Sequence, residues 1–262
     1  MPAILSLGRA LIEGRGPMRE ELQNRLISSW PEIFRDVGRP LTESLMAFGI
    51  DTDDGWFELL DVLCRVLTLR ATAENLWPPT AVQVKEKFGG LRFYTRGGDE
   101  MWSHGAIQFC DSISYRICEV SGMPGRIAKR YGWYKTLSPE IAHRKEYEFV
   151  SADPEAGTDP DPPLPPMSRP EVARILKARW PDSLRCVPQI DGGWLDIADI
   201  LLGQFALRDG ADPCAVAFID DLREVDGQLV VRAVTRTIRN QGAVAMAIAL
   251  AARTDPATGG PR

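Results

Sequence analysis

The sequence predicts an α+β protein made of two related α-α-β-β-α units, joined by a linker rich in Pro and Asp. Three observations predict this class. Apolar residues recur with helix period in some segments and strand period in others, the same order of patterns occurs twice, and a segment without core-forming side chains separates the two sets. We therefore expect domains at 1–150 and 167–255, with a linker over 151–166 and a flexible tail over 256–262.

The composition is that of a globular protein. Of the 262 residues, 44% are hydrophobic and 26% are charged, which excludes a disordered chain, a collagen-like fibre and a disulfide-rich miniprotein. No apolar run approaches the roughly 20 residues that cross a bilayer, so we expect no membrane contact. The N-terminus has no basic start typical of a signal peptide, and the 5 cysteines are an odd number. These features predict a cytoplasmic protein.

Nearly all of the net charge of −5 lies in the predicted linker. Residues 151–166 hold 4 acids, no base and 6 prolines. Residues 1–150 hold 19 Lys and Arg against 20 Asp and Glu, and residues 167–262 hold 12 of each. The global charge therefore gives no argument for a basic partner.

Two ungapped blocks on either side of the linker resemble each other. REELQNRLISSWPEIF at 19–34 matches RPEVARILKARWPDSL at 169–184, with an offset of 150 residues. GWFELLDVL at 55–63 matches GWLDIADIL at 193–201, with an offset of 138. The matched tryptophans are Trp30 with Trp180 and Trp56 with Trp194. We infer that the two units arose by a tandem duplication.

The first unit is predicted to begin with two helices. Apolar residues share one face over 20–30, and Pro31 ends that helix. Asp54 is a suitable N-cap for a second helix from Trp56 to about Leu69.

A hairpin and a third helix complete this unit. Over 81–88 the residues alternate, with Val82, Val84 and Phe88 pointing to one face. Gly89 and Gly90 form a turn, a second strand follows over 91–94, and helical spacing resumes over 106–117.

The second unit repeats this order. We expect helices ending at Trp180 and starting at Trp194, then a strand near Val216–Ile219. A turn at Asp226-Gly227 leads to a strand over 229–234, and an alanine-rich helix runs through 243–252. The alanines predict close packing of that last helix.

Paired carboxylates are the first candidate for chemistry. Glu58 and Asp61 lie one turn apart on a predicted helix, and Asp196 and Asp199 repeat them. Such pairs could bind a metal or act in acid–base catalysis. Acids are also favoured in a first helical turn by the helix dipole, and this structural interpretation is preferred.

Other catalytic signatures are missing from the sequence. The 2 histidines, His104 in a predicted polar turn and His143, follow no nucleophile motif and are expected at the surface. The glycine pairs match no phosphate loop.

The segment 116–145 combines basic and aromatic residues. It holds 7 Lys and Arg against 2 acids. This combination can contact phosphate or single-stranded nucleic acid, although a solvated face with aromatic rings packed inward is the preferred alternative. The candidate binding residues are Arg126, Lys129, Arg130, Tyr131, Trp133, Tyr134 and Lys135.

One motif resembles a known group of proteins. QVKEKFGGLRFY at 83–94, preceded by DGW at 54–56 and followed by CEVSGMPG at 118–125, is similar to a family of uncharacterised bacterial and prophage proteins. The resemblance covers roughly residues 50–143. Its members carry a zinc-knuckle pattern, CExCG…TLC, in which Ser121 and Ser138 here replace cysteines. The resemblance thus implies a degenerate zinc-knuckle-like extension over 116–145.

Metal binding is not expected in this extension. A structural zinc needs four ligands, and Cys118 and His143 supply only two. We therefore expect no cofactor.

The leading functional hypothesis is a non-catalytic cytoplasmic protein that binds another protein. Small accessory proteins of prophage distribution often act as immunity proteins or antitoxins, so the resemblance implies a toxin as the partner. One alternative is a nucleic-acid-binding or phage-related regulatory protein that uses 116–145. Another is a hydrolase that uses Glu58 and Asp61.

Overall fold

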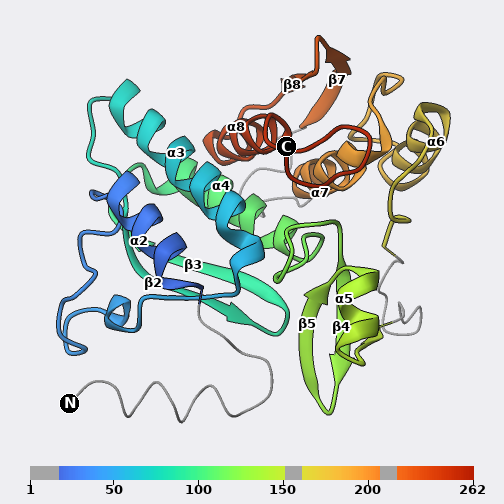
Figure 1. The fold of residues 1–262 in the computed structure, drawn as a ribbon. Helices are drawn as coiled ribbons and strands as arrows, with labels where there is room; N and C mark the ends of the chain where they lie inside the picture. Colours follow the sequence, from blue (N-terminus) through green and yellow to red (C-terminus); the bar gives the residue numbers. More distant parts are fainter. Residues whose placement is uncertain (1–17, 151–160, 207–216) are drawn as a thin grey trace.

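The first half of the chain combines helices with a three-stranded sheet. The computed structural model describes residues 18–150, 161–206 and 217–262 (Figure 1). β1 pairs in parallel with β2, which pairs antiparallel with β3. The elements in chain order are α2 (Glu20–Ser29), η1 (Leu45–Phe48), β1 (Ile50–Asp51), η2 (Asp54–Trp56), α3 (Phe57–Ala73), β2 (Thr80–Lys87), β3 (Gly90–Arg96) and α4 (Glu100–Ser114).

The second half has the same order of helices and hairpin strands. β7 and β8 pair antiparallel, and isolated parallel bridges join Leu184 and Gln189 to β7. The protein is therefore α+β, as the sequence predicts. Val216, where the first strand was expected to begin, lies outside the described residues. The elements are α6 (Arg169–Arg179), η3 (Gly192–Trp194), α7 (Leu195–Ala206), β7 (Phe218–Val225), β8 (Gln228–Val234) and α8 (Ile238–Ala251).

A small unit between the halves was not predicted in this form. It consists of β4 (Arg126–Arg130), β5 (Trp133–Leu137), α5 (Pro139–Arg144) and β6 (Glu148–Phe149), with strand order β5-β4-β6. Figure 1 shows it in green, beside the end of the β2–β3 hairpin. Its own small apolar cluster is formed by Cys118, Ala128, Leu137, Ile141 and Ala142.

The two halves share hairpin register, bulge position and tryptophan hydrogen bonds, including at positions where their residues differ. The hairpins β2–β3 and β7–β8 have equivalent registers at an offset of 138, and each has a bulge, at 81–83 and at 219–221. Trp56 Nε1 donates to the Ile117 carbonyl at 2.9 Å, and Trp194 Nε1 donates to the Thr254 carbonyl at 3.2 Å. A tandem duplication would explain this agreement, and it stays a prediction.

The halves pack directly on each other through α4 and α8. Both helices have a glycine where they cross. A Cβ on Gly105 would lie 1.8 Å from the Arg239 carbonyl oxygen, and a Cβ on Gly242 would lie 2.1 Å from the Trp102 carbonyl oxygen. The contact is thus reciprocal, and buried residues of both halves form one hydrophobic cluster. The close packing expected for the alanine-rich helix is explained by this crossing.

The segments outside the predicted domains also make contacts. Pro162, within the predicted linker, is buried, whereas 151–160 lie outside the described residues. Residues 256–262, expected as a flexible tail, form a turn in which Asp255 N–H donates to the Gly260 carbonyl at 2.8 Å. Gly193 N–H donates to the Pro256 carbonyl, also at 2.8 Å.

Three local predictions are wrong. Asp54 does not cap α3, because a 3₁₀ turn precedes that helix and the Asp54 carboxylate accepts hydrogen bonds from Arg19. Phe88 does not face the core but is 65% exposed, because it lies in a turn with a φ of 53° where strand alternation has ended. His104 lies within α4, which begins earlier than expected because Asp99 caps it.

Candidate functional site

The predicted binding residues lie on the β4–β5 hairpin and divide into two groups by burial. The side chains near the turn, Lys129 to Tyr134, are exposed or half-buried. Arg126 and Lys135, at the base of the hairpin, are buried, with relative exposures of 9% and 4%. The base of this hairpin is therefore part of the folded interior, whereas its turn is available at the surface.

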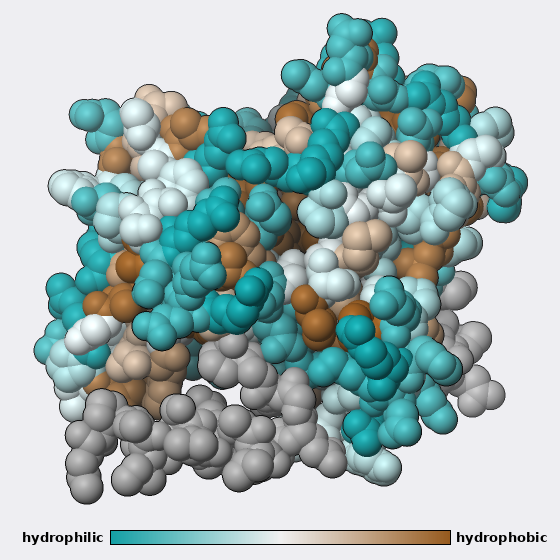
Figure 2. Space-filling view, viewed as in Figure 1, coloured by the Kyte–Doolittle hydropathy of each residue, from teal (hydrophilic) through white to brown (hydrophobic). Residues whose placement is uncertain are grey.

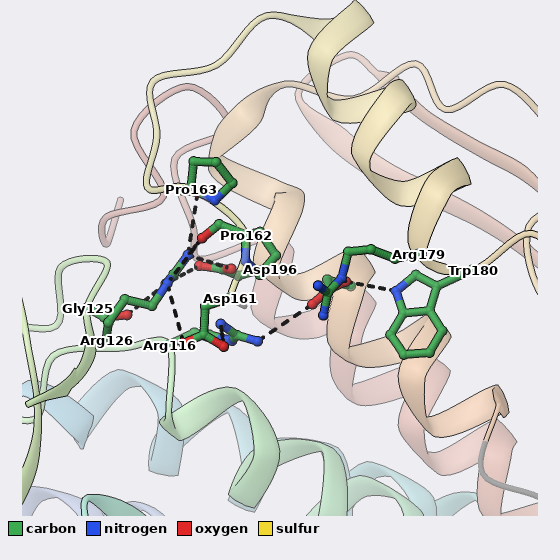
Figure 3. A network of polar contacts seen from close by, with 10 residues as sticks. Arg116, Gly125, Arg126, Asp161, Pro162, Pro163, Arg179, Trp180 and Asp196 are labelled. Atoms are coloured by element: carbon green, nitrogen blue, oxygen red, sulfur yellow. Dashed lines mark hydrogen bonds and ion pairs between the residues drawn. The ribbon is translucent and has the colours of Figure 1, made fainter. Parts of the chain in front are cut away.

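Arg126 connects the hairpin to the second half of the chain (Figure 3). Its Nη1 and Nη2 donate to the two carboxylate oxygens of Asp196 on α7, at 2.9 and 3.0 Å. Nη2 also donates to the Pro162 carbonyl at 2.7 Å, and Nη1 to the Gly125 carbonyl at 2.7 Å. Burial raises the pKa of Asp196, an effect that Arg126 opposes. Arg126 thus contributes to folding rather than to a free surface.

Lys135 is also held by acids. Its Nζ donates to Asp53 at 2.7 Å and to Glu119 at 3.2 Å. Burial lowers the pKa of Lys135, but the two carboxylates outweigh this and raise it overall. Burial raises the pKa of Glu119 to about 7, although Lys135 opposes the rise. This cluster joins β5 to the loop that precedes η2.

The turns of two hairpins meet beside an open cavity of about 560 Å³. Thr136 Oγ1 on β5 donates to the Gly89 carbonyl in the β2–β3 turn at 2.6 Å, which ties the hairpins together. We call this cavity the hairpin cleft. Its lining residues are Asp51, Lys85, Glu86, Lys87, Phe88, Tyr131, Gly132, Trp133 and Tyr134.

Both turns place an aromatic residue in an unfavourable backbone conformation. Phe88 and Gly89 have φ values of 53° and 81°, and Tyr131 and Gly132 have 49° and 85°. Positive φ at both central residues is typical of a type I′ hairpin turn, which favours Asn, Asp or Gly. The corresponding turn of the second half uses Asp226. Phe88 and Tyr131 are nevertheless 65% and 79% exposed, so packing does not explain them.

Cations surround these rings. Lys87 Nζ lies 5.5 Å from the Phe88 ring centroid, and Arg130 Cζ lies 5.0 Å from that of Tyr131. Lys129 Nζ lies 5.2 Å from the centroid of Tyr134. The surface is therefore aromatic at its centre and basic at its margin.

The paired carboxylates of the sequence have mostly structural partners. Trp30 Nε1 donates to Asp61 Oδ1 at 2.8 Å, and Trp180 Nε1 donates to Asp199 Oδ1 at the same distance. Asp196 is paired with Arg126, as described above. Glu58 differs from these three because it lines a separate cavity. No sequence signal distinguishes Glu58, since its helical spacing from Asp61 is repeated in the second half.

The candidate zinc ligands are not arranged as a metal site. Cys118 is fully buried in the apolar cluster of the small unit, and His143 is exposed on α5. The described parts of the chain hold no group of three or more His, Cys, Asp or Glu side chains suited to a metal ion. These residues do not fit a structural zinc, and the expectation of no cofactor stays a prediction.

Comparisons with protein-family models, curated proteins and solved structures give no match to this chain. The resemblance to the prophage family therefore stays a prediction. Within 18–150, 161–206 and 217–262, no helix has the length and apolar character required to cross a membrane.

Proposed function

We propose that this protein is a non-catalytic binding module that recognises an acidic segment of a partner protein through the hairpin cleft. The observation that carries the proposal is the pair of exposed aromatic residues, Phe88 and Tyr131, in positive-φ turns. A bulky residue in this conformation costs about 1–2 kcal/mol. Because neither ring is buried, the rings contribute little to folding that would offset this conformational cost. Backbone strain without such compensation is typical of a functional surface.

The chemistry of the cleft favours an acidic protein segment. Aromatic side chains supply the apolar contact area that dominates protein interfaces. Lys85, Lys87, Lys129 and Arg130 lie around them and complement negative charge. The partner therefore presents an apolar or aromatic group flanked by Asp or Glu.

A nucleic acid is the second candidate, since the same residue types bind single strands. Two features favour the protein partner. Asp51 and Glu86 line the cleft, and their charge opposes a strand with a phosphate at every nucleotide more than a segment with a few acidic residues. Cations also lie near the rings of Phe88 and Tyr131, which leaves less ring surface for base stacking.

The proposal extends to a cytoplasmic immunity-type protein that neutralises a toxin. The support for the toxin is the resemblance to prophage proteins given by the QVKEKFGGLRFY motif. The free state of Cys64, Cys110, Cys118 and Cys186 supports a reducing compartment. A hydrolase that uses Glu58 and Asp61 is less favoured, because Asp61 holds the indole of Trp30.

The test uses a variant that should fold at least as well as the wild type. Replacing both turn aromatics, Phe88→Asn and Tyr131→Asn, relieves backbone strain and should raise the melting temperature. The same variant should weaken binding of the partner several hundredfold, because exposed aromatic anchors contribute about 2 kcal/mol each and each 1.4 kcal/mol is a factor of ten. The matched control is Asp226→Asn in the equivalent turn, which should change neither quantity.

Binding is measured by calorimetry with the purified products of the adjacent genes. The proposal predicts that one of them binds the wild-type protein and Asp226→Asn equally, and the double variant weakly. It is overturned if none binds, or if the double variant binds as tightly as the wild type. Binding to single-stranded DNA that weakens steeply with salt and is lost in the double variant would replace the protein partner by a nucleic acid.

A further inference from the structure

The two halves exchange an arginine contact across their interface. Arg116, at the end of the first half, lies 3.6 Å from Asp199 of the second half. Arg253, at the end of the second half, lies 3.7 Å from Asp61 of the first half. Asp61 and Asp199 also hold equivalent indoles, as described above. The two acids therefore share an indole and an arginine of the other half, and Asp199 is also paired with Arg179 of its own half at 2.7 Å.

The acid one turn earlier on each helix has a different environment in the two halves. The guanidinium of Arg126 occupies the site beside Asp196 on α7 and donates paired hydrogen bonds of 2.9 and 3.0 Å to its carboxylate (Figure 3). We call this the filled site. The Pro162 carbonyl accepts further N–H groups of the same guanidinium at 2.7 and 3.3 Å. This is a built guanidinium site, with a carboxylate and a backbone carbonyl as acceptors.

Glu58 on α3 occupies the equivalent position, and a cavity of about 320 Å³ lies beside it. Figure 2 shows a hollow with an apolar floor between α3 and the C-terminal segment. The Glu58 side chain is 38% exposed as a whole, but its Oε2 atom is buried and accepts no hydrogen bond from the described residues. Its nearest cation there is Arg253 Nη1, at 3.6 Å, which is too long for a hydrogen bond.

Among the residues that the structure describes, no arginine forms with Glu58 the paired hydrogen bonds that Arg126 forms with Asp196. Asp196 faces Arg126 of the small unit, and Asp199 faces Arg116 of the first half and Arg179 of its own half. In the described parts of the chain, Glu58 and Asp61 face Arg253, the equivalent of Arg116. A buried carboxylate oxygen without a donor is unfavourable, so a cationic ligand would gain free energy from binding here.

We propose that this cavity binds a guanidinium group, from an arginine side chain of a peptide or from a free guanidino compound. Glu58 would accept paired hydrogen bonds from the ligand, as Asp196 does from Arg126. Leu22, Phe57 and Leu250 line the cavity and would contact the methylene groups of an arginine side chain. Arg19, which also lines it, is neutralised by Asp54. The site shares no lining residue with the hairpin cleft and does not depend on the proposed function.

The test is a titration of the full chain with Nα-acetyl-L-argininamide. Binding is measured by calorimetry and by the amide NMR shifts of Gly122 and Gly259, which line the cavity. We expect saturable binding and shifts at these amides. The citrulline analogue, a neutral isostere, should not bind, and the lysine analogue should bind more weakly because it lacks the planar fork. Glu58→Gln should raise the dissociation constant roughly tenfold or more.

Two further variants separate charge from folding. Glu58→Asp, which copies the acid of the filled site, should retain binding. Glu74→Gln, at the exposed far end of α3, is the matched control and should bind as the wild type does. Titrating an arginine-containing hexapeptide distinguishes the two sources, since tighter binding than the amide indicates a peptide and equal binding a free compound. The proposal is overturned if no saturable binding occurs, if citrulline binds equally, or if Glu58→Gln has no effect.

Discussion

The crossing of α4 and α8 gives the sharpest test of how the two halves are joined. Gly105→Ala and Gly242→Ala each add one methyl group at this crossing. In Gly105→Ala the methyl would lie 1.8 Å from the Arg239 carbonyl oxygen, and in Gly242→Ala 2.1 Å from that of Trp102. Since Cβ contacts below 3.0 Å essentially do not occur, the backbones must separate by about 1 Å. No side-chain rotation can relieve a clash with a backbone oxygen.

The expected loss of stability follows from two opposing effects. Alanine is better than glycine in a helix by about 1 kcal/mol. Overpacking a close contact costs about 1–3 kcal/mol, and here it opens an interface that belongs to the core of both halves. The difference between the two effects is a loss of up to about 2 kcal/mol in the free energy of urea unfolding for each variant. Gly203→Ala on α7 is the control, because its methyl would meet only the Trp180 ring, at 3.3 Å.

The double variant tests whether both clashes belong to one contact. Moving α4 away from α8 once would relieve both methyl groups, so the double variant should cost less than the sum of the singles. Gly203→Ala should be neutral or stabilising by up to about 1 kcal/mol. The reasoning is refuted if the single variants are as stable as Gly203→Ala, or if their costs add fully.

Three further predictions concern single groups. Trp30→Phe removes the N–H that Asp61 accepts and should lower the free energy of unfolding by about 1–3 kcal/mol in urea titrations; an unchanged midpoint would contradict this. Burial raises the pKa of Asp111 from 3.8 to about 7, so the folded state keeps a proton that the unfolded state releases, and stability should fall as pH rises between these values. Asp111→Asn should flatten that fall in melting temperature against pH, and an unaltered slope would refute the assignment. Zinc or a chelator should leave the melting temperature unchanged, whereas a rise with zinc that Cys118→Ser abolishes would contradict the expectation of no cofactor.

Apolar periodicity was enough to predict the elements whose burial is local. The helix α3 and the hairpin strands β2 and β3 lie within a few residues of their predicted bounds, because one face of each packs on the core. The β4–β5 hairpin escaped prediction because two of its buried side chains are cations. Arg126 and Lys135 are buried only because acids distant in sequence, Asp196 and Glu119, accept their hydrogen bonds. A pattern within one segment cannot contain that information.

The absence of information on distant contacts also explains which parts of the candidate sites the sequence could not predict. The sequence placed the basic and aromatic residues of 126–135 in one group, but their contacts divide them into a structural base and an exposed turn. Phe88 was assigned to the same face as Val82 and Val84, because strand alternation does not show that the turn begins one residue before Gly89. Glu58 resembled its neighbour Asp61 in sequence, and only the structure separates them, because Asp61 accepts the Trp30 N–H and Glu58 Oε2 accepts no hydrogen bond from the described residues.

Differences between the halves are more informative about function than their common features. Where both halves keep a contact, such as the bond from Trp30 to Asp61, folding is a sufficient reason for it. Where only one half has a feature, folding of the other half shows that the architecture does not require it. The β7–β8 hairpin turns with Asp226 at positive φ, so the architecture does not need Phe88 at the equivalent turn. We propose that a contact outside the fold accounts for this strained, exposed ring, and this is why the hairpin cleft, rather than the better-packed acids, carries the proposed function.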